Sequence, residues 1–187
     1  MAFCVVYDAC VLYPAMLRDL LLRIAVEGIV RARWSDEILD ECFEAIARDR
    51  PDLAPTALAR TRRLMNEAVP DCLVTEHQSL MPGLLLPDPD DRHVLAAAIR
   101  AGAQAIVTFN VADFPTERLA AFGMEAKHPD DFVVETIDLA PAAMGRIIES
   151  QHLALTHPPV SRAEILDSLE RAGLVQAAVR LRSLDSP

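Results

Sequence analysis

The order of apolar and polar residues along the first 128 positions switches repeatedly between two periods. Short apolar runs predict buried strands, and the longer stretches between them repeat their apolar side chains with the spacing of one helix face. Because strands and helices alternate, the pattern predicts an α/β fold with a small, mainly parallel sheet. The expected strands are Ala2–Tyr7, Val30–Trp34, Cys72–Val74, Ala105–Thr108 and Met124–Ala126.

Residues that start or stop helices mark the segments between these strands. Asp88 is expected to cap one helix, with Pro89 at its first helical position, where a proline loses no hydrogen bond. Ser35 is a good N-cap for an earlier helix. The expected helices run from Pro14 to Gly28, from Ser35 to just before Pro51, from about Pro55 to Ala68, from Asp88 to Gly102, and briefly from Pro115.

After Pro129 the pattern changes to helix only. Ser161 and Glu164 have the spacing of a capping box, in which each residue satisfies a backbone N–H at the start of a helix, and Gly173 ends that helix. We therefore expect two parts: an α/β domain over residues 1–128 and a helical appendage over residues 129–187.

Length and charge narrow the classes of function. The 187 residues suffice for one α/β domain with a small appendage, since typical domains have roughly 100–150 residues. The chain has 28 Asp and Glu against 18 Lys and Arg, a formal net charge of −10. A protein this acidic is repelled by nucleic acid at long range. If it acts on a polyanion, it needs a bound metal, a local basic patch or a partner.

The cysteines and the apolar segments indicate a cytoplasmic protein. Cys4, Cys10, Cys42 and Cys72 form no Cys-x-x-Cys pair, which favours a reduced compartment. The N-terminus has no basic segment of the kind that precedes a signal sequence. The Leu-rich stretch of residues 16–30 is interrupted by charges and is too short to span a bilayer. We therefore expect no membrane segment.

Two acids follow predicted strands, where a parallel sheet gathers its ligands. Asp8 directly follows the first strand, and the helix expected from Pro14 starts too far along the chain for Asp8 to cap it, so function is favoured. Asp113 is either an acid of the same site or the N-cap of the helix near Pro115. Thr108 and Asn110 could support such a site by hydrogen bonding.

Two further acids lie on predicted helices. Asp91 falls one turn before Val94 and Leu95 and on their face, so it is expected to point toward the sheet, whereas Asp88 and Asp90 are explained by capping. Glu41 shares one helix flank with two other glutamates, and such rows usually face solvent. Periodicity alone does not select one of the three, Glu37, Glu41 and Glu44. We interpret the histidines, which lack ligand spacing, as surface or loop residues: His77, His93, His128, His152 and His157.

Four segments resemble, in order, the successive motifs of the PIN domain family, and most of all its VapC-like branch, the toxins of bacterial toxin–antitoxin pairs. They are residues 5–14, 34–41, 88–98 and 107–114. The resemblance implies a three-layer α/β/α fold and a metal-dependent endoribonuclease. It further implies an RNA substrate, a cognate antitoxin as partner, and a homodimer as one form of assembly.

The resemblance also implies a ligand set. Asp8, Glu41, Asp91 and Asp113 would hold Mg²⁺ or Mn²⁺, ions that prefer hard oxygen ligands. It thereby selects Glu41 from the row of three. Many relatives have Asp at Asn110, so the fourth ligand is either Asn110 or Asp113, and many have Asn at Cys10. Some of these toxins carry a similar helical tail.

Two alternatives to a nuclease stay open at this stage. A non-catalytic PIN-like module that binds a protein is favoured by the net charge and disfavoured by the complete set of acids. A phosphatase using Asp8 as nucleophile commonly has a second acid two positions later, where this chain has Cys10.

If RNA is the substrate, the candidate phosphate contacts are Arg60, Arg62, Arg63 and Arg92.

Overall fold

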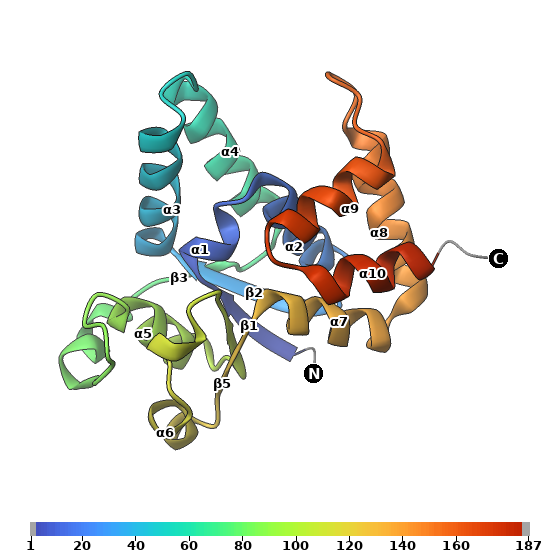
Figure 1. The fold of residues 1–187 in the computed structure, drawn as a ribbon. Helices are drawn as coiled ribbons and strands as arrows, with labels where there is room; N and C mark the ends of the chain where they lie inside the picture. The colour runs from blue at the N-terminus through green and yellow to red at the C-terminus, as the bar shows by residue number, and fades with distance from the viewer. Residues whose placement is uncertain (1–2, 185–187) are drawn as a thin grey trace.

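A five-stranded parallel sheet forms the centre of the protein (Figure 1). The computed structural model describes residues 3–184, so Ala2, expected at the start of the first strand, lies outside the described residues. The strand order is β3-β2-β1-β4-β5, and every neighbouring pair is parallel, which confirms the predicted α/β class. The strands are β1 Phe3–Tyr7, β2 Val30–Ser35, β3 Leu73–Val74, β4 Ala105–Val107 and β5 Glu125–Lys127.

Helices connect the strands and cover the sheet. The α-helices are α1 Ala9–Leu12, α2 Ala15–Val26, α3 Asp36–Asp49, α4 Pro55–Ala68, α5 Arg92–Ala101, α6 Thr116–Leu119, α7 Pro129–Leu139, α8 Pro141–Ala154, α9 Arg162–Arg171 and α10 Val175–Ser183. Short 3₁₀ turns form η1 Gln78–Gly83, η2 Val111–Asp113 and η3 Ala120–Phe122. None of the helices within residues 3–184 has the length and apolar character needed to cross a membrane.

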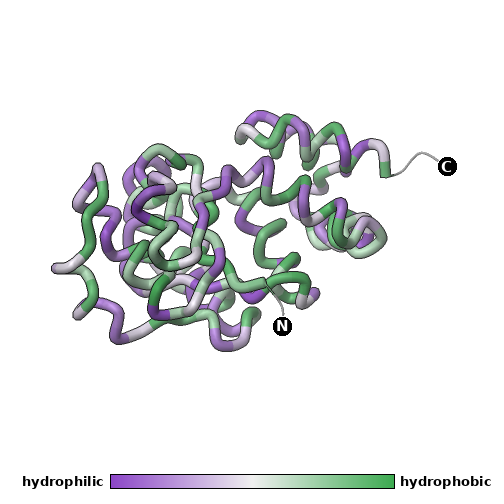
Figure 2. Tube along the Cα trace, turned by 90° about the horizontal axis from the view of Figure 1, so that it is seen from below, coloured by the Kyte–Doolittle hydropathy of each residue, from purple (hydrophilic) through white to green (hydrophobic). Residues whose placement is uncertain are grey.

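The helices bury one face each against the strands or against one another. Hydrophobic and hydrophilic residues alternate along the helices, as Figure 2 shows. Helix α5 packs on β1, β2 and β4, and α2 packs on β2. The ring of Tyr7 in β1 meets that of Phe132 in α7 edge-on, with centroids 6.0 Å apart. The sheet is therefore enclosed, and its inner residues, such as Val5 and Trp34, are fully buried.

Several predicted helix signals are confirmed at atomic detail. Ser35 caps α3, because its Oγ accepts a hydrogen bond from the Ile38 N–H at 3.2 Å. The capping box is present at the start of α9, where Ser161 accepts from the Glu164 N–H and Glu164 accepts from the Ser161 N–H. Helix α4 has the predicted bounds.

The start predicted at Asp88 and Pro89 is wrong by one turn. Helix α5 begins at Arg92, and Asp91 takes the N-cap position without a side-chain capping bond. The Asp88 carboxylate instead accepts from the Asp90 N–H at 2.9 Å, which closes a tight turn two residues on. Aspartate favours such turns as strongly as it favours helix caps. Asp88 therefore shapes the turn before α5, and the Asp91 side chain takes no part in capping the helix.

The C-terminal helices form a bundle that packs on the rest of the chain. Helix α10 packs on α7 and α9, while α8 and α9 contact α2. The buried Asp130 of α7 ties the bundle together, because its two oxygens accept from the N–H groups of Gln176 at 3.1 Å and Ala177 at 2.8 Å. These amides open α10, so Asp130 caps a helix 46 residues further along the chain. The two-part division at residue 128 stays a prediction.

Candidate metal centre

The strand order places a topological switch point at the end of β1. The chain continues from β1 to β2 on one side and places β4 on the other, so the connections diverge between β1 and β4. The Asp8 N–H donates to the Val107 carbonyl at 3.1 Å, which joins the ends of these two strands. Ligands of open α/β sheets bind at such a switch point, outside the carboxyl ends of the strands.

The carboxylate of Asp8 is buried at this point and held by three groups. Its Oδ1 accepts from the Ala9 N–H at 2.7 Å, and its Oδ2 accepts from the Thr108 hydroxyl at 2.7 Å and from the Cys10 thiol at 3.2 Å. Asp8 is the N-cap of the short helix α1, whereas the N-cap of α2 is Pro14, which confirms that Asp8 does not cap the helix expected from Pro14. Helix α1 was not predicted, because four residues are too few to show a helical period.

Cys10 belongs to the same set of hydrogen bonds. Its sulfur lies 3.3 Å from the Thr108 hydroxyl and accepts from the Phe109 N–H at 3.3 Å. Burial, followed by the negative charge of Asp8, raises the pKa of the thiol to about 12. The thiol therefore stays protonated at neutral pH and donates to Asp8. The departure from the family pattern at Cys10 has a structural explanation: the sulfur links Asp8 to the loop after β4.

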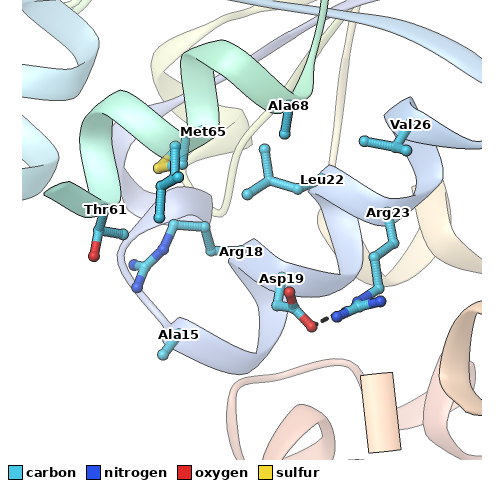
Figure 3. Close-up of a pocket in the computed structure, with 10 residues that line it drawn as sticks. Ala15, Arg18, Asp19, Leu22, Arg23, Val26, Thr61, Met65 and Ala68 are labelled. Carbon is cyan, nitrogen blue, oxygen red and sulfur yellow. Dashed lines mark hydrogen bonds and ion pairs between the residues drawn. The ribbon is translucent and has the colours of Figure 1, made fainter. Parts of the chain in front are cut away.

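Helix α1 is fixed at its other end by Arg18 of α2. The guanidinium donates to the carbonyls of Leu12 at 2.7 Å and Tyr13 at 3.1 Å, at the end of α1. Figure 3 shows Arg18 in a hollow of about 440 Å³ between α2 and α4, whose walls also include Leu22 and Met65. This hollow is not at the acids, and its connection to them is through Arg18 and α1.

Asp91 is surrounded by the other predicted acids. Burial, and then the charges of Asp8, Asp113, Asp88 and Glu41, raise the pKa of its carboxyl group to about 6. Coulomb interactions between side chains weaken with distance. The structure therefore brings the three other candidate ligands within electrostatic reach of Asp91.

Glu41 differs from the two other glutamates on its flank of α3. Its Oε1 forms an ion pair with His93 Nε2 at 2.9 Å, and its side chain is 50% exposed. Glu37 is engaged elsewhere, by Gln78 of η1 and by His77, whose Nε2 is 3.4 Å from Glu37 Oε2. Only Glu41 of the three is among the charges acting on Asp91. The fold thus separates residues that periodicity left equivalent.

The interpretation of His77 and His93 as surface or loop residues is wrong. His93 is 6% exposed and His77 is fully buried. Burial alone would lower the pKa of His93, but contact with Glu41 and the charges of Glu41, Asp8 and Glu37 raise it. One signal was available: His93 lies one turn before Ala96 and Ala97, on the buried face of α5.

The loop after β4 carries the remaining candidates. Thr108 is buried, donates to Asp8 and accepts from the Asn110 N–H at 3.0 Å. Asp113 ends η2, and the N-cap of α6 is Pro115, so the interpretation of Asp113 as that cap is wrong. Asp113 acts on the pKa of Asp91, whereas the neutral Asn110 carries no charge to do so. The choice between them as fourth ligand stays a prediction.

The helical appendage reaches this loop at Phe109. The Phe109 ring meets His128 edge-on, with centroids 5.3 Å apart. On another side it lies against the turn between α9 and α10, where a β-carbon added to Gly173 would come within 3.5 Å of Phe109 Cε1. The residue next to Thr108 is therefore packed between the two parts of the chain.

The candidate ligands are of the kind that a hard divalent cation prefers, although they do not surround a cation site in this structure. Among residues 3–184, no group of three or more His, Cys, Asp or Glu side chains is arranged to hold a metal ion as it stands. Carboxylates without a cation repel one another, and Glu41 is drawn to His93. The chemistry fits, because the candidate ligands are carboxylates, and burial and neighbouring carboxylates raise the pKa of Asp91.

The predicted phosphate contacts are partly occupied. Arg62 pairs with Asp36 at 2.7 Å and also with Asp40, and Arg63 pairs with Glu67 at 3.3 Å. These pairs join α3 to α4 or lie within α4. As contacts to RNA, all four arginines stay predictions: Arg60, Arg62, Arg63 and Arg92.

Comparison with known families agrees with this geometry. A family model described as "PIN domain" matches residues 4–112, more than half of the chain, and the protein therefore belongs to the PIN domain family. The match includes Asp8, Glu41 and Asp91 and stops one residue before Asp113. A second model, "VapC50 C-terminal domain", matches residues 129–183.

A curated relative carries the name VapC50, which also appears in the description of the second model. The chain is 42% identical over 79 residues to the Mycobacterium tuberculosis protein called "Putative ribonuclease VapC50". The aligned region is 42% of this chain and 47% of that protein, so the match spans about half the length of the relative. No solved structure matches the chain.

Proposed function

We propose that the protein is an endoribonuclease dependent on Mg²⁺ or Mn²⁺, and the toxin of a toxin–antitoxin pair. One observation carries the proposal: the pKa of Asp91 is raised to about 6 by burial and by neighbouring carboxylates, at the switch point of a PIN domain. A cluster of acids that disfavours its own charge is typical of a site that binds cations.

Asp8, Glu41, Asp91 and Asp113 would hold the cation. When bound, Mg²⁺ or Mn²⁺ polarises a phosphate and activates water for in-line attack. The protein's part is to keep the oxygens in place. Thr108 and Cys10 hold Asp8 from one side and the start of α1 holds it from the other. Asp91 would bind the cation as a carboxylate, and no side-chain nucleophile is required.

The charge of the protein shapes its partners. At a net charge of −10, RNA approaches against long-range repulsion, so the bound cation also neutralises the site for a polyanion. We include a cognate antitoxin as partner, because the relative in M. tuberculosis bears a VapC name and the C-terminal helices match its domain.

The test is cleavage of a single-stranded or looped RNA by the purified full chain. We expect activity with Mn²⁺ or Mg²⁺, loss in EDTA and recovery when metal is restored. Asp8→Asn should abolish it, while Asp40→Asn, which changes an exposed acid paired with Arg62, should not. Equal cleavage by wild type and Asp8→Asn would identify a contaminant and reject the enzyme.

A non-catalytic, protein-binding PIN module is the second candidate. It is favoured by the absence, among residues 3–184, of any group already arranged to hold a metal. It predicts that millimolar Mn²⁺ neither binds nor supports cleavage. The same preparations therefore discriminate between the two candidates.

A further inference from the structure

A buried histidine faces the one candidate ligand that is on a solvent-exposed helix flank. His93 lies on α5 two residues after Asp91, and its Nε2 is 2.9 Å from Glu41 Oε1 on α3. Helices α3 and α5 pack on each other, so the backbone separation of the pair is set by the fold. The fold therefore fixes the position of His93 by packing. The half-exposed Glu41 side chain is not fixed in that way.

Glu41 needs such a partner. A glutamate has several rotatable bonds, and holding it in one conformation costs on the order of 1.5–2 kcal/mol of side-chain entropy. Half of the Glu41 side chain is exposed, whereas Asp8 is held by three donors. Its neighbouring carboxylates repel it. Contact with a nearly buried imidazole offsets both effects.

The chain contains its own comparison for this pair. One turn earlier on α3, Glu37 faces the fully buried His77 at 3.4 Å. The chemistry is the same, but Glu37 also accepts from Gln78 and is not among the charges acting on Asp91. One histidine–glutamate pair thus lies at the acids, and the other joins α3 to η1.

We propose that His93 is a positioning residue that holds the Glu41 carboxylate at the metal centre. This inference rests on the proposed function, since it takes Glu41 to be a ligand. His93 itself does not bind the cation. It orients a ligand from behind, and removing a partner of that kind typically weakens metal affinity by about 10–100-fold.

The experiment measures Mn²⁺ binding by the full chain through calorimetric titration. His93→Ala should raise the Kd by about 10–100-fold, and His93→Gln, whose amide N–H can still donate to the carboxylate, should recover much of the loss. The control His77→Ala should lower the melting temperature yet leave the Kd within about twofold. If His93→Ala fails to fold, His93→Leu fills the buried position without a donor.

A kinetic readout separates positioning from general damage. His93→Ala should recover kcat at saturating Mn²⁺, with the KM for RNA unchanged. An unchanged Mn²⁺ Kd in His93→Ala or His93→Leu would overturn the inference. Glu41→Gln distinguishes a failure of the positioning role from a failure of the proposed ligand set. If Glu41→Gln weakens Mn²⁺ binding while the His93 variants do not, only the positioning role fails. If Glu41→Gln binds Mn²⁺ like wild type, the ligand set of the proposed function fails as well.

Discussion

The acids on the outer helices and the acids at the end of β1 have opposite surroundings. On the surface, carboxylates face guanidinium groups: Asp36 and Asp40 face Arg62, Glu27 faces Arg146, and Asp167 and Glu170 face Arg182. At the sheet edge, Asp91 faces Asp8, Asp113 and Glu41.

The difference shows how to separate structural from functional acids in an acidic protein. A surface ion pair is close to neutral for stability, because its Coulomb gain is offset by side-chain entropy and screening. A cluster of like charges is unfavourable, and its members persist only if something else selects them. Carboxylates paired with arginine are therefore explained as surface ion pairs, and the group of neighbouring carboxylates around Asp91 marks the site.

The largest expected effect is on RNA cleavage, and it distinguishes Glu41 from Glu37 on the same flank of α3. Glu41→Gln should reduce RNA cleavage by on the order of 100-fold or more, since a cation ligand is lost, whereas Glu37→Gln should stay within about twofold. Initial rates at fixed Mn²⁺ measure both. An active Glu41→Gln beside an inactive Glu37→Gln would show that the wrong glutamate has been assigned to the site.

The next effect is on stability in the presence of metal. Mn²⁺ at tenfold its Kd should stabilise the wild type by about 1.4 kcal/mol through linkage. Asp91→Asn should gain much less, because an amide neither carries the charge nor binds the ion as tightly. Thermal melts with EDTA and with Mn²⁺ give the difference, and Asp40→Asn is the matched control. A wild type whose melting ignores millimolar Mn²⁺ would contradict the metal assignment.

Without metal, the same substitution should have the opposite sign. The pKa of Asp91 is raised in the folded state to about 6, so protonation stabilises the fold and this stability is lost as the pH rises through that value. Asp91→Asn should therefore be more stable than wild type at pH 7 by about 1 kcal/mol, after allowance for partial exposure.

That advantage should disappear below about pH 4, where Asp91 is protonated in both the folded and the unfolded chain. Urea denaturation in EDTA at pH 7 and pH 4 measures it. A lower stability of Asp91→Asn at pH 7 would indicate that the acid serves α5 as a helix cap.

The smallest effect is expected on stability when a surface ion pair is removed. Arg62→Gln removes the partner of Asp36 and Asp40 and should cost only about 0.5–1 kcal/mol, with less effect in high salt. Its response to Mn²⁺ should match the wild type. Urea denaturation at low and at molar NaCl provides the measurement, and a salt-independent loss of several kcal/mol would show that these pairs are not ordinary surface pairs.

Much of the fold could be predicted because its signals are local. The strand at Val30–Ser35, the bounds of α4 and the capping box of Ser161 and Glu164 depend on residues adjacent in sequence. The parallel sheet follows from their alternation. The start of α5 was missed because Asp88 serves equally well in a turn and in a cap, and only the surrounding chain decides between them.

The candidate site was harder, because its contacts join distant segments. The ion pair of His93 and Glu41 connects two helices, α3 and α5, through residues 52 positions apart in the sequence. No periodicity in either helix reveals it. Glu41 was selected only through the resemblance to a family, and Cys10 could be interpreted only when Thr108, 98 residues away, lay beside it.

The buried carboxylate of Asp130 depends on α10 for its hydrogen-bond donors. Two backbone amides at the start of α10 are its donors, and Asp130 itself opens the helical bundle. A shortened chain that ends before Gln176 would leave a buried carboxylate without those amides, a loss of at least about 1–3 kcal/mol. Shortening the protein by one small helix would therefore disturb α7, whose Phe132 packs on Tyr7, the last residue of β1 and the neighbour of Asp8.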